Sequence, residues 1–300
     1  MEIAIQNLTK YYGSFCAVDS VSFSFSSGKL TAIVGRNGSG KTTTIRSLLG
    51  LVPMDGGEII INGNTTGLNL KRVGYLAEER GLFPKETIQN QLQFFARLKG
   101  MTVKDANRSI DHWLERLEIP QYKKSTLESL SKGNQQKIQM IASLLHDPDI
   151  VLFDEPFSGL DPVNMQMVID LLGDLRKAGK CILVSSHQLP LIEQVCEDIC
   201  IIDHAKSVYW GPLDALKAMY GESCVRFCVT DQKIPDTIAA VPTAPNQYKV
   251  RLGTPENPDL HAFLRKIVDA GLSLETLERS QKSLQEIFLE LVGEEEQADA

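Results

Sequence analysis

The segment at residues 35–42 constrains this chain more than any other part of it. It reads Gly35-Arg36-Asn37-Gly38-Ser39-Gly40-Lys41-Thr42, which matches G-x-x-x-x-G-K-[ST] in full. An apolar run at 30–34 precedes it and a helix-like stretch at 42–51 follows. Glycines let successive backbone N–H groups converge on phosphate oxygens, because no Cβ stands in the way. The pattern therefore predicts a strand, a phosphate-binding loop and a helix in direct succession.

Individual residues of this loop have distinct expected roles. Lys41 brings a positive charge to the β- and γ-phosphates and is a candidate catalytic residue, and Thr42 offers a hydroxyl to Mg²⁺. The N-terminus of the following helix adds the positive end of its dipole. The residues expected to contact the nucleotide are Gly35, Asn37, Gly38, Ser39, Gly40, Lys41, Thr42 and Thr43.

A second motif places two carboxylates at the end of an apolar run. Residues 150–153 read Ile-Val-Leu-Phe, and Asp154 and Glu155 follow them. A buried strand that ends in Asp154 can hold this carboxylate beside a metal ion, usually through water. Glu155, one residue later, can polarise a water molecule that attacks the γ-phosphate. Phosphoryl transfer depends on such positioning and charge neutralisation, so the pair indicates nucleotide hydrolysis with Mg²⁺ as cofactor.

Composition limits the class of protein. The chain has 300 residues, of which 43% are hydrophobic, enough for one large domain or a large domain with a small one. No apolar run approaches the ~20 residues needed to cross a bilayer. The sequence starts Met-Glu-Ile-Ala, without the basic region of a signal peptide. We therefore expect a cytoplasmic location.

Charge and cysteine content exclude two further classes. The net charge is −7, and residues 221–300 hold 8 basic and 14 acidic residues, so most of the excess lies there. No basic stripe marks a nucleic-acid surface, so no nucleic-acid partner is expected. Two C-x₃-C pairs, Cys196/Cys200 and Cys224/Cys228, lack further zinc ligands and are interpreted as reduced, buried or half-buried thiols.

The pattern of apolar residues divides the chain into segments. Strand-like segments at 3–8, 21–25 and 58–61 predict an antiparallel β layer, and residues 87–119 predict a helical insert. The apolar stripe of this insert, which includes Phe95 and Leu98, is expected to pack in the core rather than to bind a cofactor. Alternating helices and strands between 134 and 203 predict a parallel sheet with right-handed crossovers. After about residue 221, strands at 224–230, 247–252 and 273–277 and helices at 258–270 and 281–292 predict a small α+β domain. The acidic segment 294–300 is expected to be a disordered tail.

A third motif connects the chain with a known family. Residues 130–134, Leu-Ser-Lys-Gly-Asn, lie before a predicted helix and upstream of Asp154. The segment resembles the signature motif of ATP-binding cassette (ABC) ATPases, whose common form is Leu-Ser-Gly-Gly-Gln. The resemblance covers residues 1 to about 220. It implies an α/β P-loop NTPase of ABC type, in which a RecA-like core carries an antiparallel β layer and a helical subdomain at about 87–145. A small α+β domain at 221–293 would follow this cassette.

The resemblance also implies roles for residues outside the phosphate loop. Tyr12 is similar to the aromatic residue that stacks on adenine, with Tyr11 as the competing candidate. Asp161 belongs to a segment, Ser158-Gly159-Leu160-Asp161, that resembles the loop at the interface of an ABC dimer. His187 is similar to the histidine that contacts the γ-phosphate, and it is a candidate catalytic residue beside Glu155. Ser131, Gly133 and Asn134 would bind the nucleotide of a second subunit. The implied assembly is a homodimer, or a heterodimer with a similar ATPase, that encloses two ATP molecules.

The sequence departs from the family pattern at two places. Glu78 stands where the family usually has Gln, so it can coordinate Mg²⁺ but cannot donate a hydrogen bond when ionised. In the signature, Lys132 replaces a glycine and Asn134 replaces the usual glutamine. Lys132 either adds positive charge near the partner's phosphates or faces solvent. The form of both segments resembles the branch that serves bacterial type-2 exporters, which often carry a small C-terminal domain.

The function implied is an ATP-hydrolysing subunit that powers a membrane permease on a separate chain, in the direction of export. It would lie on the cytoplasmic face of the membrane, with a groove near residues 78–100 as the docking surface. Phe83, Phe94 and Phe95 either anchor the permease there or pack within the insert. The alternative function is a soluble ABC-type ATPase that acts on nucleic acid or ribosomes. A regulatory role for residues 221–300 as a ligand sensor is compatible with the function of powering a permease.

Overall fold

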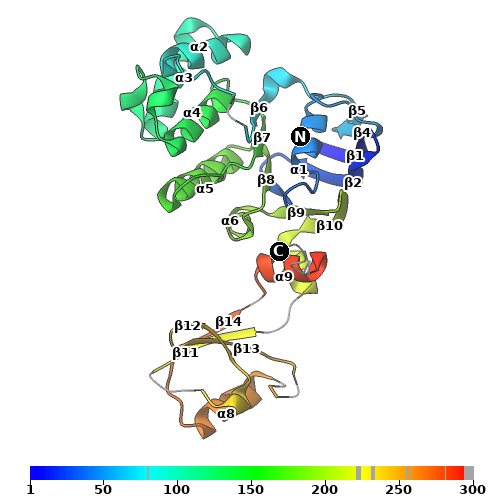
Figure 1. The fold of residues 1–300 in the computed structure, drawn as a ribbon, viewed down its shortest axis with the longest axis vertical. Helices are drawn as coiled ribbons and strands as arrows, with labels where there is room; N and C mark the ends of the chain where they lie inside the picture. The colour runs from blue at the N-terminus through cyan, green and yellow to red at the C-terminus, as the bar shows by residue number, and fades with distance from the viewer. Residues whose placement is uncertain are drawn as a thin grey trace. The chain divides into compact units, whose positions relative to one another are not determined.

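The computed structural model describes residues 1–79, 81–220, 224–230, 234–254, 256–257, 259–280 and 282–293. The chain divides into two compact units, Met1–Leu213 and Asp214–Ala300 (Figure 1). The division falls at the start of a helix, α7 (Leu213–Met219), whereas the sequence pattern places it after this helix, near residue 220. The predicted acidic tail at 294–300 lies outside the described residues.

The first unit contains an antiparallel sheet near its N-terminus. Its strands are β1 (Glu2–Tyr12), β2 (Phe15–Ser26), β4 (Gly56–Ile61) and β5 (Asn64–Thr65), in the order β2-β1-β4-β5. β1 and β2 are longer than the sequence pattern predicts, and they form a hairpin whose tip pairs Tyr12 with Phe15. Apolar side chains of these strands alternate with polar ones, so one face is buried and the other is exposed.

A second sheet forms the centre of the unit. It consists of β3 (Leu30–Val34), β6 (Val73–Leu76), β7 (Ile150–Asp154), β8 (Cys181–Ser186), β9 (Asp198–Asp203) and β10 (Lys206–Pro212), in the order β10-β9-β3-β8-β7-β6. All neighbouring pairs are parallel except β10 with β9. β3 and β7 are buried along their whole length, as strands covered on both faces require. The antiparallel edge strand β10 is absent from the sequence prediction.

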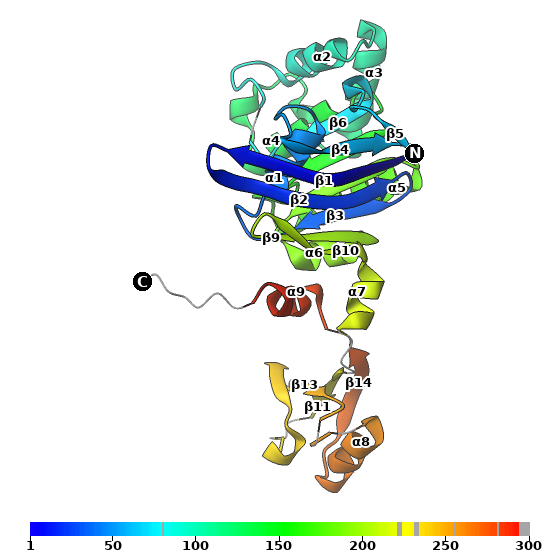
Figure 2. The same ribbon diagram turned by 90° about the vertical axis from the view of Figure 1, so that its right-hand side faces the viewer.

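Helices and the antiparallel sheet cover the two faces of this central sheet. The helices are α1 (Lys41–Leu48), α5 (Pro162–Lys177) and α6 (Leu189–Val195). Figure 2 shows β1, β2 and β4 as a layer beside the parallel strands. One apolar core joins the layers, with Phe23 and Phe25 of the antiparallel sheet, Ile45 of α1, and Leu152 and Leu183 of the parallel sheet. The carboxyl ends of the parallel strands, where β3 leads into α1, therefore sit on a rigid support.

The predicted helical insert is formed by α2 (Ile88–Leu98), α3 (Val103–Arg116) and α4 (Lys132–Leu144). Figure 1 groups these helices beside β6 and β7. Most of the predicted apolar stripe is buried, but the prediction is wrong for Leu98, which is 64% exposed. Leu98 is the last residue of α2, and its side chain lines an open cavity together with Phe95 and Lys99, where it stays accessible to solvent.

The second unit is an antiparallel sheet with helices. Its elements are α7, β11 (Cys224–Val229), β12 (Val241–Ala244), β13 (Gln247–Arg251), α8 (Leu260–Asp269), β14 (Leu274–Ser280) and α9 (Leu284–Val292), and the strand order is β12-β13-β11-β14. Phe227 of β11 packs edge-on against Phe263 of α8, with ring centroids 5.1 Å apart. The sequence pattern did not predict β12, an edge strand that contains Pro242, which a strand tolerates only at such a position.

Candidate nucleotide-binding site

The phosphate loop connects β3 to α1 and needs glycine at two positions for steric reasons. A Cβ at Gly35 would lie 2.2 Å from the carbonyl oxygen of Ile202 and 2.5 Å from Ser39 Oγ. Gly40 has a φ of +110°, and a Cβ there would lie 2.5 Å from the carbonyl oxygen of Ala17. Both residues are packed against neighbouring backbone, which makes the loop a tight cradle. Ser39 Oγ is buried without a hydrogen-bond partner among the described residues.

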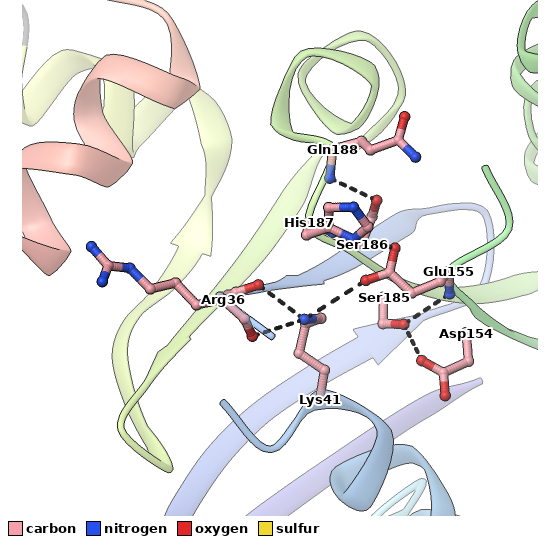
Figure 3. A network of polar contacts seen from close by, with 9 residues as sticks. Arg36, Lys41, Asp154, Glu155, Ser185, Ser186, His187 and Gln188 are labelled. Carbon is pink, nitrogen blue, oxygen red and sulfur yellow. Dashed lines mark hydrogen bonds and ion pairs between the residues drawn. The ribbon is translucent and has the colours of Figure 1, made fainter. Parts of the chain in front are cut away.

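Lys41 begins α1, and its side chain folds back over the loop. The residue is 6% exposed, and its Nζ donates hydrogen bonds to the carbonyl oxygens of Gly35 at 2.9 Å and Arg36 at 3.1 Å. The same Nζ lies 3.7 Å from Oε1 of Glu155 (Figure 3). The ammonium group is therefore held at the mouth of the loop, beside a carboxylate from the end of β7.

Glu155 links Lys41 to His187. It is 4% exposed, and its Oε2 lies 2.9 Å from Nδ1 of His187. The backbone N–H of His187 also donates to this oxygen, at 3.4 Å. The imidazole itself remains about half exposed. Tertiary structure thus brings together three predicted catalytic residues that come from three separate elements.

Asp154 is fully buried behind this group. Its Oδ1 accepts a hydrogen bond from the hydroxyl of Ser185, while Oδ2 has no hydrogen-bond partner among the described residues. Burial raises the pKa of the Asp154 carboxyl, and the nearby hydroxyls of Ser185 and Thr42 oppose that rise. The predicted metal ligands Thr42 and Asp154 therefore lie side by side.

A cavity of about 490 Å³ opens in front of these residues. It is lined by Tyr12, Phe15, Ala17, Asn37, Gly38, Gly40, Lys41, Thr42, Thr43, Glu78, Glu155 and His187. Most of these residues were predicted from motifs far apart in the sequence. Phe15 and Ala17 were not, because only the pairing of the β1–β2 hairpin and its approach to the loop bring them there.

The aromatic end of the cavity distinguishes the two candidate tyrosines. Tyr12 lines the cavity, whereas Tyr11 is outside the set of described residues that do so. Tyr12 is 50% exposed, and Nζ of Lys10 lies 5.6 Å from its ring centroid. Phe15, its cross-strand partner, is 63% exposed. Two exposed rings at a hairpin tip offer apolar faces to a flat base.

Glu78 lies on an exposed loop that follows β6. The amide of Gln139, from α4, donates hydrogen bonds to the carbonyl oxygens of Ala77 at 2.8 Å and Glu79 at 3.0 Å. The loop is thereby tied to the helical insert on both sides of Glu78. This connection gives the insert a direct mechanical link to one wall of the cavity.

The signature segment occupies a different place. Ser131 is the exposed N-cap of α4, and its hydroxyl accepts from the backbone N–H of Asn134 at 3.4 Å. Asp161 caps α5, where it accepts from the backbone N–H of Asn164 at 2.9 Å, a contact that lowers the pKa of the Asp161 carboxyl. A Cβ at Gly133 would lie 3.3 Å from Nδ2 of Asn164, so the two helix N-termini are neighbours.

The structure therefore separates the predicted nucleotide ligands into two groups. Ser131, Gly133, Asn134 and Asp161 are absent from the described residues that line the cavity, as are Gly35 and Ser39 of the loop. The lining does include Tyr12 and the loop residues Asn37, Gly38, Gly40, Lys41, Thr42 and Thr43. Lys132, whose role the sequence left open, is exposed in the first turn of α4. The signature segment and the phosphate loop of one chain do not meet at a common cavity among these residues.

The metal-binding capacity of the site is limited to a few oxygen atoms. Among the described residues, no group of three or more His, Cys, Asp and Glu side chains could hold a metal ion. The hydroxyl of Thr42 and the unpartnered Oδ2 of Asp154 are hard oxygen donors. This set fits Mg²⁺, which is usually bound by one or two protein oxygens together with phosphates and water.

All six cysteines are free thiols, and burial raises the pKa of Cys181 and Cys200 to about 12.

The fold and the phosphate loop together define a P-loop NTPase, and comparisons with known proteins refine this class. The family model described as "ABC transporter" matches residues 18–158. The ABC transporter ATP-binding protein YhaQ of Bacillus subtilis is 36% identical over 296 residues, 97% of this chain and 98% of that protein. The bacitracin transport ATP-binding protein BcrA of Bacillus licheniformis is 31% identical over 97% of both chains.

A solved structure agrees with these relatives. It is described as the ATP-binding subunit of an ABC transporter, has a TM-score of 0.67 at 26% identity, and covers 73% of this chain and 93% of its own. The chain belongs to the ABC transporter family, as an ATP-binding and ATP-hydrolysing subunit. The predicted family and fold class are confirmed. None of the helices in the described part of the chain is long and apolar enough to cross a membrane.

Proposed function

We propose that this chain is one half of an ATP-driven motor that binds MgATP, dimerises around it and powers export through a permease on separate chains. The observation that supports the catalytic part most directly is the grouping of Lys41, Glu155 and His187 at one cavity. Each of these side chains has a task in hydrolysis that its position suits.

Lys41 has the clearest task in binding. Its ammonium group donates hydrogen bonds to two loop carbonyls and lies near Glu155. Phosphate oxygens are stronger acceptors than carbonyl groups, since hydrogen bonds between charged partners are the shorter and stronger class. A triphosphate would therefore draw Lys41 away from Glu155 and leave this carboxylate available to a water molecule. Mg²⁺, held by Thr42 and Asp154 when bound, would neutralise phosphate charge.

Glu155 and His187 have the task of orienting the attacking water. Glu155 Oε2 accepts a hydrogen bond from the backbone N–H of His187 and lies 2.9 Å from its Nδ1, and these contacts hold the carboxylate at the end of β7. A general base must lie within hydrogen-bond reach of the proton that it removes. We assign that proton transfer to Glu155, and we assign to His187 the contact with the γ-phosphate that follows release from Glu155.

Dimer formation is supported by the exposed signature segment. The N-terminus of α4 is an anion-binding feature, because its backbone N–H groups and dipole point outward beside Ser131. Among the described residues, those that line the 490 Å³ cavity include none from this helix terminus. A nucleotide bound to the loop of a second copy, or of a similar ATPase, is the ligand that this surface would take. Hydrolysis that rises with the square of protein concentration at low concentration would support the proposal, and full activity in a strictly monomeric protein would refute it.

The permease docking surface is proposed at the junction of the helical insert and the sheet. A cavity of about 240 Å³ lies there, lined by Val73, Tyr75, Ala77, Gly81, Leu82, Phe95, Leu98, Lys99, Gln139, Ala142, Ser143 and His146. Phe83 and Phe94, both 47% exposed, pack against Phe95 at its rim. The exposed apolar edge and the tie from Gln139 to the loop at 77–79 would let a docked segment act on Glu78.

Export, rather than import, rests on the resemblance of the segments at 78–82 and 131–134 to the type-2 exporter branch. BcrA, a full-length relative named for bacitracin transport, is compatible with this direction. The chain itself would lie at the cytoplasmic face of the membrane through its permease. The permease, not this chain, would carry the path of the cargo.

Co-expression with a candidate permease tests the docking surface. The variant Phe94→Asp should abolish co-purification with the permease and transport, while ATP hydrolysis by the isolated subunit stays within about twofold, because a charge at an exposed apolar contact is costly only when that contact is buried. Val103→Asp, an exposed apolar residue on α3, is the matched control and should leave co-purification intact. Permease binding by Phe94→Asp at the parental level would overturn the assignment of this surface.

A further inference from the structure

We propose that Ser185 is a positioning residue for hydrolysis, which joins the metal-binding carboxylate of Asp154 to the backbone of the general base Glu155. The inference rests on the proposed roles of these two residues. Ser185 is fully buried near the end of β8, the strand that pairs with β7, and it is the register partner of Asp154. The sequence offered one signal, a pair of serines, Ser185 and Ser186, at the end of a strand otherwise apolar.

The direction of each hydrogen bond at Ser185 is determined by its partners. The backbone N–H of Glu155 can only donate, and it donates to Ser185 Oγ at 3.1 Å. The single hydroxyl proton is therefore free to go to Asp154 Oδ1, the other partner of Oγ. The three groups form a chain from N–H to hydroxyl to carboxylate, in which each bond polarises the next (Figure 3).

This chain decides which oxygen of Asp154 remains available. Oδ1 is committed to Ser185, so Oδ2 is left as a buried acceptor without a hydrogen-bond partner in the described structure. A carboxylate free to rotate could present either oxygen, or both, to its surroundings. Ser185 restricts the side chain to one orientation and directs Oδ2 to whatever the site binds beside Thr42. Partners of metal-binding carboxylates act in this way in many proteins.

Ser185 also holds Glu155 in an unusual backbone conformation. Glu155 has a φ of +50°, in the left-handed region that residues with a Cβ rarely occupy. Its N–H donates to the carbonyl oxygen of Ser185 as well as to Oγ, both at 3.1 Å. A strained residue of this kind persists where its surroundings over-determine it. The turn it makes places the carboxylate between Lys41 and His187.

Two variants separate this role from simple packing. Ser185→Cys keeps nearly the same volume but offers a weak donor, and Ser185→Ala removes the donor altogether. We expect both to lower kcat for ATP hydrolysis about 10- to 100-fold and to raise the Mg²⁺ concentration at half-maximal rate about tenfold. The KM for ATP and the affinity for nucleotide without Mg²⁺ should change less than about threefold, because the phosphate loop is untouched.

The control is Thr31→Val, which removes a fully buried hydroxyl that has no hydrogen-bond partner among the described residues, two strands from β7 in the same sheet. It should leave kcat and the Mg²⁺ dependence within about twofold of the parent. Parental kcat and Mg²⁺ dependence in Ser185→Cys would overturn the proposal, as would loss of Mg²⁺-free nucleotide binding in that variant, which indicates a folding role. Absence of Mg²⁺-dependent hydrolysis in the parent chain would instead refute the proposed function itself.

Discussion

Two helix N-termini in the first unit are built in opposite ways, although both are predicted to bind nucleotide phosphates. At α1, the N-cap is Gly40, which has no side chain to satisfy the first backbone N–H groups. At α4, the N-cap Ser131 accepts a hydrogen bond from Asn134 within the same turn. The first terminus leaves its donors to a ligand, and the second already satisfies part of them.

The surroundings of the two helix N-termini also differ, because one is buried and the other is exposed. Lys41 at α1 is buried and contacts Glu155, which follows a strand more than a hundred residues later in the chain. Ser131 is exposed, and within the described part of the chain its hydroxyl accepts a hydrogen bond from its own helix, α4. The comparison shows that one terminus is assembled by contacts between elements far apart in the chain. The other is assembled locally and gains its function only when a second molecule reaches it.

The largest effect is expected at the assembled terminus. Glu155→Gln keeps the shape of the side chain but cannot accept a proton, so kcat should fall about a thousandfold, within the range for loss of a general base. Nucleotide affinity should stay within a few-fold, since Lys41 and the loop are unchanged. Phosphate release and binding of a fluorescent ATP analogue measure the two quantities. Glu79→Gln, on the exposed loop nearby, serves as control.

Hydrolysis by Glu155→Gln at the parental rate would contradict the catalytic role assigned to the residues around the N-terminus of α1. The contacts between Lys41, Glu155 and His187 would then have a structural meaning alone. A deficit shared equally by Glu79→Gln would point to the same conclusion.

The exposed terminus is tested by a change of charge that preserves the cap. Ser131→Asp and Ser131→Asn both provide good N-cap acceptors, so the stability of α4 should hardly change. A carboxylate facing a γ-phosphate is repelled, and we expect hydrolysis to fall about a hundredfold in the Asp variant and much less in the Asn variant. Nucleotide binding by the monomer should remain at the parental level in both.

Mixing two inactive variants sharpens this result. In a dimer of Ser131→Asp with Glu155→Gln, one of the two sites combines an intact loop and base with an intact signature segment. Activity should therefore reappear in the mixture at a fraction of the parental rate, measured by phosphate release. If the mixture stays as inactive as its components, the signature segment does not act across a dimer interface.

A smaller effect is expected from the charge of Lys41 itself. Lys41→Met retains the length of the side chain and loses its ammonium group, which should weaken ATP binding about tenfold, the value of one hydrogen bond between charged partners. ADP binding should weaken less, because it lacks the γ-phosphate. Arg36→Met, a neighbouring loop residue, is the control, and calorimetric titration is the measurement. Equal losses for Lys41→Met and Arg36→Met would contradict the specific role of Lys41.

The smallest effect is expected for the pH dependence of folding stability that arises from Asp161, the N-cap of α5. The backbone N–H of Asn164 lowers the pKa of Asp161, so the folded state favours its ionised form. The ionised Asp161 stabilises the folded state at pH values above its pKa in the unfolded chain, about 3.9. This stabilisation is lost as the pH falls through the lower pKa that Asp161 has in the folded chain. Asp161→Asn should remove this small dependence, so thermal unfolding curves of variant and parent should converge in acid. A difference that grows below pH 4 would contradict the assignment.

Motifs carried most of the prediction because their chemistry is local. The loop at 35–42, the carboxylate pair at 154–155 and the order of helices and strands between them follow from spacing and residue type. The family and fold class inferred from them are confirmed. Leu98 shows the limit of this reasoning, since a periodic apolar position at the end of a helix has no neighbour to cover it.

Contacts between elements far apart in the chain could not be predicted from the sequence. Phe15 enters the cavity through the register of a hairpin, β10 joins the sheet as an antiparallel edge, and Ser185 meets Asp154 through parallel pairing of β7 and β8. A register shift of one residue would turn each side chain to the other face of its sheet. No local signal in a single sequence reports that register.

The sequence by itself determined that this chain binds a nucleotide phosphate and which residue types do so, because glycines, a lysine and paired carboxylates express that chemistry wherever they are folded. Tertiary structure alone decided which of them share a cavity and which are left exposed. It placed Lys41, Glu155 and His187 together, since strand order sets the neighbours at the carboxyl edge of a sheet. It kept Ser131 and Asp161 apart from them, at helix ends that cap only themselves.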